Sequence, residues 1–149
     1  MTNNHGTDWD LICSFEVAEH VSRSRVPKFL DNILKHCNER TLVLLSTPCF
    51  SEKIGAADNH TYDGQDGFGI RRQELTREEL KELIEPRFNI EENYGTFASQ
   101  KDYKPHMTDS ELDMFNRLSK YYDTNLLSVI FAPLFPAQSR NNIWICKIK

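Results

Sequence analysis

The stretch Asp10-Leu-Ile-Cys-Ser-Phe15 decides the fold class, because it is a short and nearly continuous apolar run. Strands with one solvated face alternate apolar and polar residues, whereas a continuous run is typical of a parallel sheet covered on both faces. A second run, Leu42-Val-Leu-Leu45, lies within residues 41–46 and precedes Thr47-Pro48. We therefore expect two parallel strands, the second of which ends before Pro48, since proline cannot donate a hydrogen bond to a sheet.

The segment between these two runs has the periodicity of an amphipathic helix. Apolar residues recur there at three- and four-residue steps, and Pro27 suits the first helical turn. The apolar positions are Phe29, Leu30, Ile33, Leu34 and Cys37. A strand, a helix and a strand in this order predict an α/β domain.

Two capping boxes, Thr76-Arg-Glu-Glu79 and Thr108-Asp-Ser-Glu111, predict helix starts in the second half of the chain. Apolar patterns predict a strand within residues 88–97 and a closing strand over residues 142–149. Residues 130–141 contain two prolines and are expected to be irregular. The helix that begins at the second capping box is expected to bury Leu112, Phe115, Leu118 and Tyr122.

The composition indicates a single globular domain that spans residues 1–149. Hydrophobic residues make up 39% and charged residues 27%, which excludes a disordered or membrane-embedded chain. The net charge of −4 gives no general attraction to nucleic acid, so such a partner needs a local basic patch. The four cysteines include no C-x-x-C pair, which favours reduced thiols over a zinc site. Without a signal-peptide pattern or a membrane-spanning apolar run, we expect a cytoplasmic protein with no membrane partner.

Residues 10–21, Asp-Leu-Ile-Cys-Ser-Phe-Glu-Val-Ala-Glu-His-Val, resemble the fourth strand and following turn of class I methyltransferases, which depend on S-adenosylmethionine (SAM). The resemblance continues in order through Leu-Leu-Ser-Thr-Pro48, Asn59-His60 and the Leu-Thr-x-x-Glu-Leu pattern at residues 75–80. It implies a fold class, namely an α/β, Rossmann-like three-layer sandwich.

Two later stretches narrow the resemblance. Residues 95–100 and 131–136 are similar to methyltransferase-like proteins of phages, which implies the cytoplasm of a host cell. Together the matching segments cover residues 8–149, so the chain resembles the C-terminal portion of the methyltransferase domain.

The family's SAM-binding portion has no counterpart in these 149 residues. Family members place a Gly-rich loop after the first strand, whereas the sole G-x-G here, Gly67-Phe-Gly69, has no strand before it. The resemblance therefore implies a partial sandwich that lacks the first strands and binds SAM poorly by itself. In the family's sheet the fourth strand pairs with the first, so residues 11–13 would form an exposed apolar edge. We expect a partner to cover this edge, either as a homo-oligomer or as a second chain.

Four residues form a candidate metal site. Glu16, Glu19 and His20 follow the first strand, and His60 lies in a long Gly- and Asp-rich loop after the second strand. Carboxylates and imidazoles at one sheet edge are suitable ligands for Mg²⁺ or Mn²⁺. The E-x-x-E-H pattern with a later histidine resembles the metal site of small-RNA 3′-terminal 2′-O-methyltransferases, although the stretch after His60 matches only in part. The alternative is that the two glutamates only place negative charge at a helix start.

The resemblance also implies roles in the reaction. His20 would accept a proton as a catalytic base, and Phe15 would contact the SAM cofactor. The implied chemistry is O-methylation of an RNA end or of a small-molecule hydroxyl, assisted by the metal ion. Two alternatives stay open: a non-catalytic, methyltransferase-like interaction protein that docks on a partner chain, and a truncated product without function.

Overall fold

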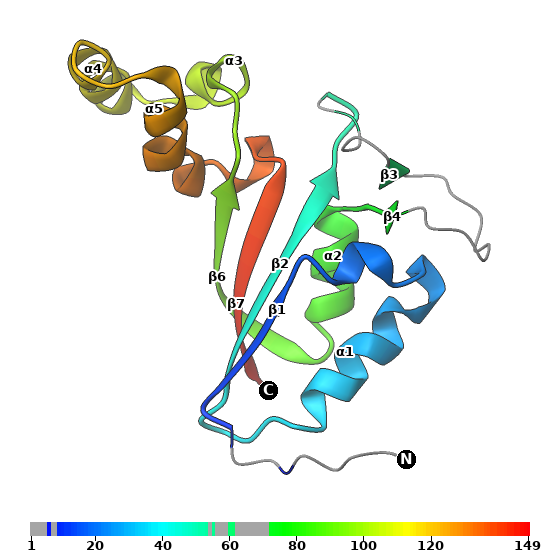
Figure 1. Cartoon of the computed structure of the whole chain (residues 1–149). Helices are drawn as coiled ribbons and strands as arrows, with labels where there is room; N and C mark the ends of the chain where they lie inside the picture. The colour runs from blue at the N-terminus through cyan, green and yellow to red at the C-terminus, as the bar shows by residue number, and fades with distance from the viewer. Residues whose placement is uncertain (1–5, 7–8, 54, 56–59, 62–71) are drawn as a thin grey trace.

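The structure is a computed structural model that describes residues 6, 9–53, 55, 60–61 and 72–149. Its main feature is an open, mixed five-stranded sheet (Figure 1). The sheet order is β1-β2-β7-β6, and a short fifth strand, β5, pairs with the end of β2. The strands are β1 (Leu11–Phe15), β2 (Leu42–Phe50), β5 (Leu75–Thr76), β6 (Phe88–Thr96) and β7 (Asn141–Ile148). This combination of a mixed sheet and helices confirms the predicted α/β class.

The two apolar runs pair as parallel strands, as predicted. Leu11 lies opposite Leu42 and Phe15 lies opposite Ser46. The closing strand β7 runs antiparallel between β2 and β6. Because β2 has a neighbour on both sides and β1 has one, β1 forms a margin of the sheet.

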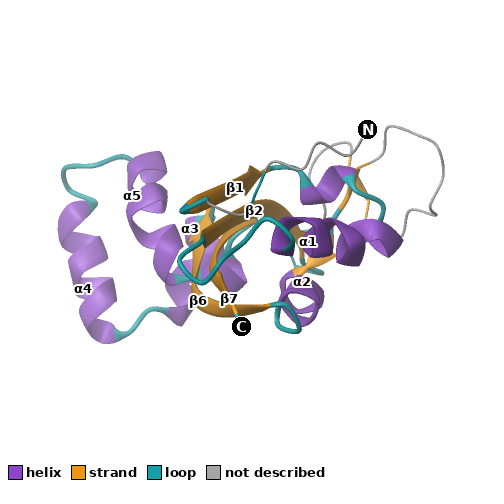
Figure 2. Cartoon of the chain, turned by 90° about the horizontal axis from the view of Figure 1, so that it is seen from below, coloured by secondary structure: helices purple, strands orange, loops and turns teal. Residues whose placement is uncertain are grey.

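Two helices cover one face of the sheet, which we call the covered face. They are α1 (Val26–Leu34) and α2 (Arg77–Ile84), and Figure 2 shows both on the same side of the strands. The alternate residues of β2 and β7 that point toward them, such as Val43, Leu45 and Trp144, are buried. The core of this face consists of Val26, Leu30, Ile33, Val43, Leu45, Cys49, Leu75, Leu80, Ile84, Phe88, Trp144 and Cys146.

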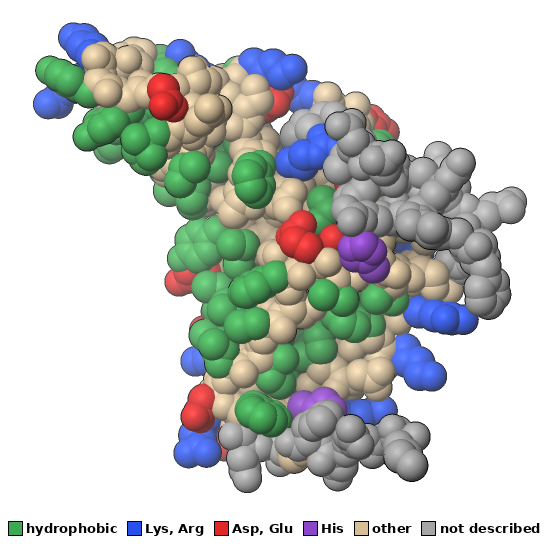
Figure 3. Space-filling model, in the orientation of Figure 1, with side chains coloured by type: hydrophobic (Ala, Val, Ile, Leu, Met, Phe, Trp, Pro, Cys, Tyr) green, Lys and Arg blue, Asp and Glu red, His purple; other side chains and the backbone are tan. Residues whose placement is uncertain are grey.

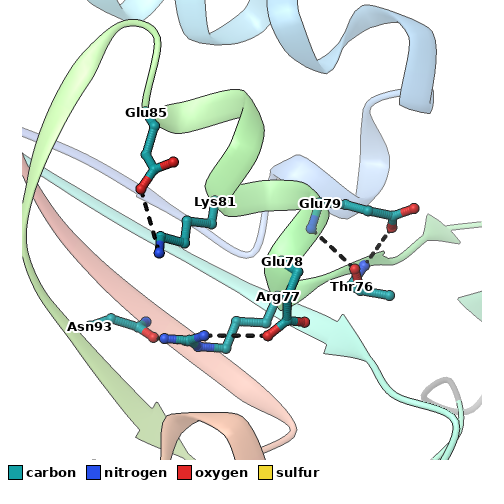
Figure 4. Close-up of polar contacts among 7 residues, drawn as sticks. All are labelled: Thr76, Arg77, Glu78, Glu79, Lys81, Glu85 and Asn93. Atoms are coloured by element: carbon teal, nitrogen blue, oxygen red, sulfur yellow. Dashed lines mark hydrogen bonds and ion pairs between the residues drawn. The ribbon is translucent and has the colours of Figure 1, made fainter.

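The first predicted capping box fixes the start of α2 (Figure 4). The backbone N–H of Glu79 donates to the Thr76 side chain, and the Thr76 N–H donates to the Glu79 carboxylate. One residue later, Arg77 Nε donates to Asn93 Oδ1 over 2.8 Å, and its guanidinium lies 5.4 Å from the centre of the Trp144 ring. Through these two contacts, Arg77 joins α2 to β6 and β7 on the covered face. Lys81 and Glu85 of the same region form a separate surface ion pair.

The opposite face of the sheet, which we call the free face, is also apolar. Its residues follow from the strand register: Cys13 lies opposite Leu44, which lies opposite Ile145, and Ser46 separates Phe15 from Ile143. The apolar members of the free face are Leu11, Cys13, Phe15, Leu42, Leu44, Ile143 and Ile145. Leu11 and Phe15 are about half exposed, and none of the seven belongs to a buried cluster of the described residues. Figure 3 shows hydrophobic side chains gathered along β1 and the side of the sheet away from α1 and α2. The described residues therefore form two layers, and the third layer of the expected sandwich stays a prediction.

Residues 97–140, between β6 and β7, form a helical arm that projects from one end of the sheet (Figure 1). Its helices are α3 (Gln100–Tyr103), α4 (Asp109–Leu118) and α5 (Thr124–Phe131), with short 3₁₀ turns between α3 and α4 and after α5. Tyr103 lies at its centre, with its ring stacked on those of Phe131 and Phe135. The arm has its own core, which consists of Ala98, Tyr103, Phe115, Leu127, Phe131, Ala132 and Phe135.

Three local predictions are corrected. Strand β2 does not end before Pro48, because the even-numbered residues of β2 direct their N–H groups toward β1, which ends at Phe15. The N–H that Pro48 lacks would face this same side, where β1 has already ended and β5 pairs only with Cys49 and Phe50, so no ladder bond is lost. Helix α5 was not predicted, and its end overlaps the segment expected to be irregular. Tyr122 follows the end of α4 and is 45% exposed, so it does not join the arm's core.

The long loop after β2 contributes two short strands, β3 (His60–Thr61) and β4 (Arg72–Gln73), which pair in parallel. Residues 62–71 between them lie outside the described part of the chain. In that described part, no helix has the length and apolarity needed to cross a membrane.

Candidate functional site

The predicted site residues follow the carboxyl end of β1, at the end of the sheet where ligands bind in open α/β folds. Glu16 has a φ of 55°, in the left-handed region that non-glycine residues rarely occupy. Its N–H still donates to the Ser46 carbonyl, so the chain leaves the sheet immediately after this residue. Such a conformation costs on the order of 1 kcal/mol and persists where surrounding contacts fix it.

Two neighbouring strands hold the Glu16 carboxylate. Ser46 Oγ of β2 donates to one carboxylate oxygen over 2.7 Å, and Asn141 Nδ2 of β7 donates to the other over 2.9 Å. Both oxygens therefore have fixed positions, while the side chain stays exposed. The carboxylate is preorganised at the surface, next to the ends of β1, β2 and β7.

Glu19 and His20 lie in the short 3₁₀ helix η1 (Ala18–His20) that follows. The Glu19 side chain is only 2% exposed, and its carboxylate accepts a hydrogen bond from Thr47 Oγ1 over 3.0 Å. Its other oxygen lies 3.7 Å from Nε2 of His20, whose side chain is 48% exposed. The buried Glu19 carboxylate therefore lies next to the partly exposed His20 imidazole.

The two glutamates contact consecutive residues of β2. Because side chains alternate along a strand, Ser46 and Thr47 point to opposite faces of the sheet, and Glu16 and Glu19 are bound on opposite sides of this strand. Among the described residues, no group of three His, Cys, Asp or Glu side chains is placed to hold a metal ion. The structure brings Glu19 and His20 together and leaves Glu16 in a separate set of contacts.

His60 and Phe15 complete the predicted set. The backbone of His60 belongs to β3, whose partner β4 packs near η1, but the His60 side chain lies outside the described residues. Phe15 ends β1 on the free face and is 53% exposed. Its accessible ring suits the predicted cofactor contact, which stays a prediction.

Sequence reasoning missed the residues that hold the two carboxylates. Ser46 and Thr47 belong to the Leu-Leu-Ser-Thr-Pro48 string, but no spacing rule pairs them with Glu16 and Glu19. Asn141 and Asn142 begin a strand whose next four residues are apolar, and two amides at such a position were an available signal. Asn142 is fully buried and its side-chain amide has no partner among the described residues, as is also true of Trp144 Nε1. These polar atoms lie on the covered face, beside Thr47 in the strand register.

Cys49, near the end of β2, is a potential nucleophile of another kind. Burial, together with a smaller effect of the nearby Glu74 carboxylate, raises the pKa of its thiol to about 12. A thiol with this pKa carries almost no thiolate at neutral pH, so thiolate catalysis by Cys49 is excluded.

The geometry supports proton transfer at His20. A carboxylate beside one ring nitrogen can orient an imidazole, and the other nitrogen can then accept a proton. The His20 side chain is 48% exposed, so the ring can be reached from solvent. No protein-family model matches the chain, and no curated protein matches it, so a functional assignment depends on this geometry and on the resemblance of residues 10–21 and 42–48 to class I methyltransferases.

Proposed function

We propose that the chain is the acceptor-side portion of a SAM-dependent methyltransferase that methylates a hydroxyl group of an RNA end or a small molecule. The SAM-binding portion is supplied by a polypeptide segment outside these 149 residues. When bound, SAM supplies an electrophilic methyl group, and the residues described here orient the acceptor and remove its proton.

The Glu19–His20 pair carries this proposal. Glu19 is buried and accepts a hydrogen bond from Thr47, its carboxylate lies 3.7 Å from Nε2 of His20, and we infer that it orients the ring when the acceptor is bound. Nδ1 then accepts the proton of the acceptor hydroxyl as the oxygen attacks the methyl group. General-base assistance of this kind contributes roughly 10²- to 10⁴-fold in rate.

The open side of the sheet supports the same proposal. The resemblance puts the family's first strand beside the strand that corresponds to β1, and the structure has no described strand there. The free face is apolar and lacks a helical layer of described residues. A segment that adds a strand at β1 and helices over the free face would place its SAM loop at the carboxyl end of β1, close to Phe15 and Glu16.

No step of the proposed reaction passes through a metal ion. The described residues do not fit a metal site, because Glu16 and Glu19 are held on opposite sides of β2. A set that includes His60 stays a prediction, and titration with Mn²⁺ tests it. Binding that disappears in both Glu16→Ala and Glu19→Ala would support the metal site, and absence of heat in the wild-type chain would remove it.

The experiment that tests the enzyme begins with the DNA immediately upstream of codon 1. If it encodes a strand followed by a Gly-rich loop, the longer polypeptide is expressed and incubated with methyl-labelled SAM and either RNA with free 3′ hydroxyls or a panel of small hydroxyl compounds. We expect label transfer that falls at least 100-fold in His20→Ala. His106→Ala is the matched control, since His106 is an exposed histidine of the arm. Equal transfer by the two variants, or failure of the longer polypeptide to bind SAM, would contradict the proposal.

A non-catalytic interaction protein is the second candidate. It is favoured by the apolar free face, which no described helix covers. This candidate gains if the upstream DNA encodes no Gly-rich loop and the chain forms a stable complex with a separate methyltransferase.

A further inference from the structure

The outer edge of β1 offers unpaired backbone groups. Leu42 N–H donates to the Asp10 carbonyl, and Glu16 N–H donates to the Ser46 carbonyl, so the even-numbered residues of this segment face β2. Because both polar groups of a strand residue point to the same side and alternate along the strand, those of Leu11, Cys13 and Phe15 point away from β2. No described strand pairs with this side (Figure 2). Natural proteins block such edges with lysine, proline or a bulge, and β1 contains none of these.

The side chains along this edge are apolar on both sides of Cys13. Within β1 they are Leu11, Cys13 and Phe15, and all three are exposed. Two such edges that run antiparallel with Cys13 on a two-fold axis oppose Leu11 of each copy with Phe15 of the other. Cross-strand pairs of aromatic and aliphatic residues stabilise a sheet, so the edge is complementary to itself.

We propose that a second copy of this chain pairs with the free edge of β1, antiparallel and centred on Cys13. Cys13 forms a hydrogen-bonded pair with Cys13 of the second copy, and Leu11 forms such a pair with Phe15 on each side of the axis. The two sheets then join into one continuous sheet with no free β1 edge.

Glu16 does not oppose this arrangement. In this register it follows the last apolar pair and lies opposite Asp10 of the second copy, where two carboxylates would repel. Its left-handed backbone turns the chain out of the strand, and its carboxylate is bound to Ser46 and Asn141 of its own molecule. The Glu16 carboxylate is therefore bound by residues of its own molecule and directed away from Asp10 of the second copy.

The inference does not depend on methyl transfer. The strand proposed for the SAM-binding portion would use the same edge, so that portion and a second copy compete for β1. Self-pairing is thus the expected state of the 149-residue chain when it is alone.

Light scattering during size-exclusion chromatography and mild oxidation test the proposal on the whole chain. We expect a mass of twice 17.4 kDa. Hydrogen-bonded antiparallel partners have Cα atoms about 5.5 Å apart, within the roughly 4.4–6.8 Å that a disulfide spans. Oxidation should therefore give a dimer on a non-reducing gel that dithiothreitol reverses, and Cys13→Ser should abolish this band while the mass of the native dimer remains.

Cys13→Lys distinguishes a dimer that forms through the β1 edge from one that forms through the free face. It places two ammonium groups opposite each other on the axis, while the exposed position keeps the monomer folded, and we expect the mass to fall to 17.4 kDa. Ile145→Lys, on the free face of β7, is the control and should leave the dimer intact. A monomeric wild-type chain, or a dimer that Ile145→Lys dissociates and Cys13→Lys does not, would overturn the proposal. A circular-dichroism spectrum like that of the wild type verifies that each variant is folded.

Discussion

The covered face and the free face of the sheet are built from the same strands and from the same kinds of residues, yet only one of them is buried. Along β7, Trp144 and Cys146 point to the covered face and are at most 1% exposed, while Ile143 and Ile145 point to the free face and are only partly buried. In β2, Val43 and Leu45 are buried and Leu44 between them is partly exposed.

This difference shows what an apolar pattern encodes. A continuous run of apolar residues requires two covered faces, but it does not say which residues provide the covering layers. Helices α1 and α2 provide one layer, and the described residues do not provide the other. Contiguous apolar surface of this kind marks a site of interaction, which is why the proposals above place partners there.

Truncation of two neighbouring residues of β7 should show the largest difference in stability between the two faces. Trp144→Ala should cost about 3–5 kcal/mol in the free energy of unfolding, because the ring is fully buried and packs under Arg77. Ile145→Ala should cost about 1 kcal/mol or less, because its side chain lies on the free face. Urea denaturation measures both values, and equal costs would show that the free face is buried in solution.

A glycine on the covered face should have the next largest effect. A Cβ atom at Gly95 would lie 2.0 Å from Ser139 Oγ and 2.4 Å from the backbone carbonyl oxygen of Ala132, so Gly95→Ala must displace the base of the arm. Overpacking of this kind costs about 1–3 kcal/mol.

Gly55→Ala is the matched control for this prediction. Gly55 has a φ of 78° and open space around it, so an alanine there should cost about 1 kcal/mol of backbone strain and leave the arm unchanged. Hydrogen exchange of residues 131–135 separates the two cases. If exchange there is unaffected by Gly95→Ala, the arm does not pack on β6 as described.

Local signals predicted most of the covered face from the sequence. The apolar runs gave β1 and β2, and the two capping boxes begin α2 and α4 as expected. The effect of Pro48 was not predictable, because it depends on which side of β2 has a neighbour. Helix α5 was missed because Leu126, Val129 and Ile130 are exposed, so the segment lacks a clear polar face. Its start was still marked by Asp123, whose side chain accepts from the backbone N–H groups of Asn125 and Leu126.

The candidate site was predictable only in part, for a different reason. Glu16, Glu19 and His20 are close in sequence, so a pattern could select them. Their partners are not close: Ser46 lies on the next strand, and Asn141 is 125 residues away from Glu16. Only the register of β2 and β7 shows that the two carboxylates separate, because the side on which each one is held depends on Ser46 and Thr47.

Labelling of the cysteines compares the exposed β1 edge with the covered face in the wild-type chain. Cys13 on the edge is exposed, whereas burial raises the pKa of Cys146 on the covered face from its usual 9.0 to about 12. That shift lowers the thiolate fraction of Cys146 at pH 8 by roughly a thousandfold, so mass spectrometry should find iodoacetamide on Cys13 long before Cys146. Because the folded-state pKa is raised, its contribution to stability is complete below pH 9 and declines as the pH rises toward 12. Comparable labelling of the two thiols in the native chain would mean that the covered face opens readily.

The smallest effect concerns the ion pair that links the two helices of the covered face. Arg87, just after α2, donates through Nε to Asp31 of α1 over 2.6 Å, and this hydrogen bond lowers the pKa of the Asp31 carboxyl below its usual 3.8. A lowered folded-state pKa stabilises the protein above the unfolded-state value, and this stabilisation is lost as the pH falls through the folded-state value. Asp31→Asn should therefore unfold more easily than the wild type at pH 6, and the difference should shrink and disappear as the pH falls below the lowered folded-state pKa of Asp31. The partly exposed pair is screened by salt, so the difference at pH 6 should also shrink in 1 M sodium chloride. The uncharged free-face variant Ile145→Ala should show neither dependence, and a pH-independent cost of Asp31→Asn would assign the link between α1 and α2 to packing alone.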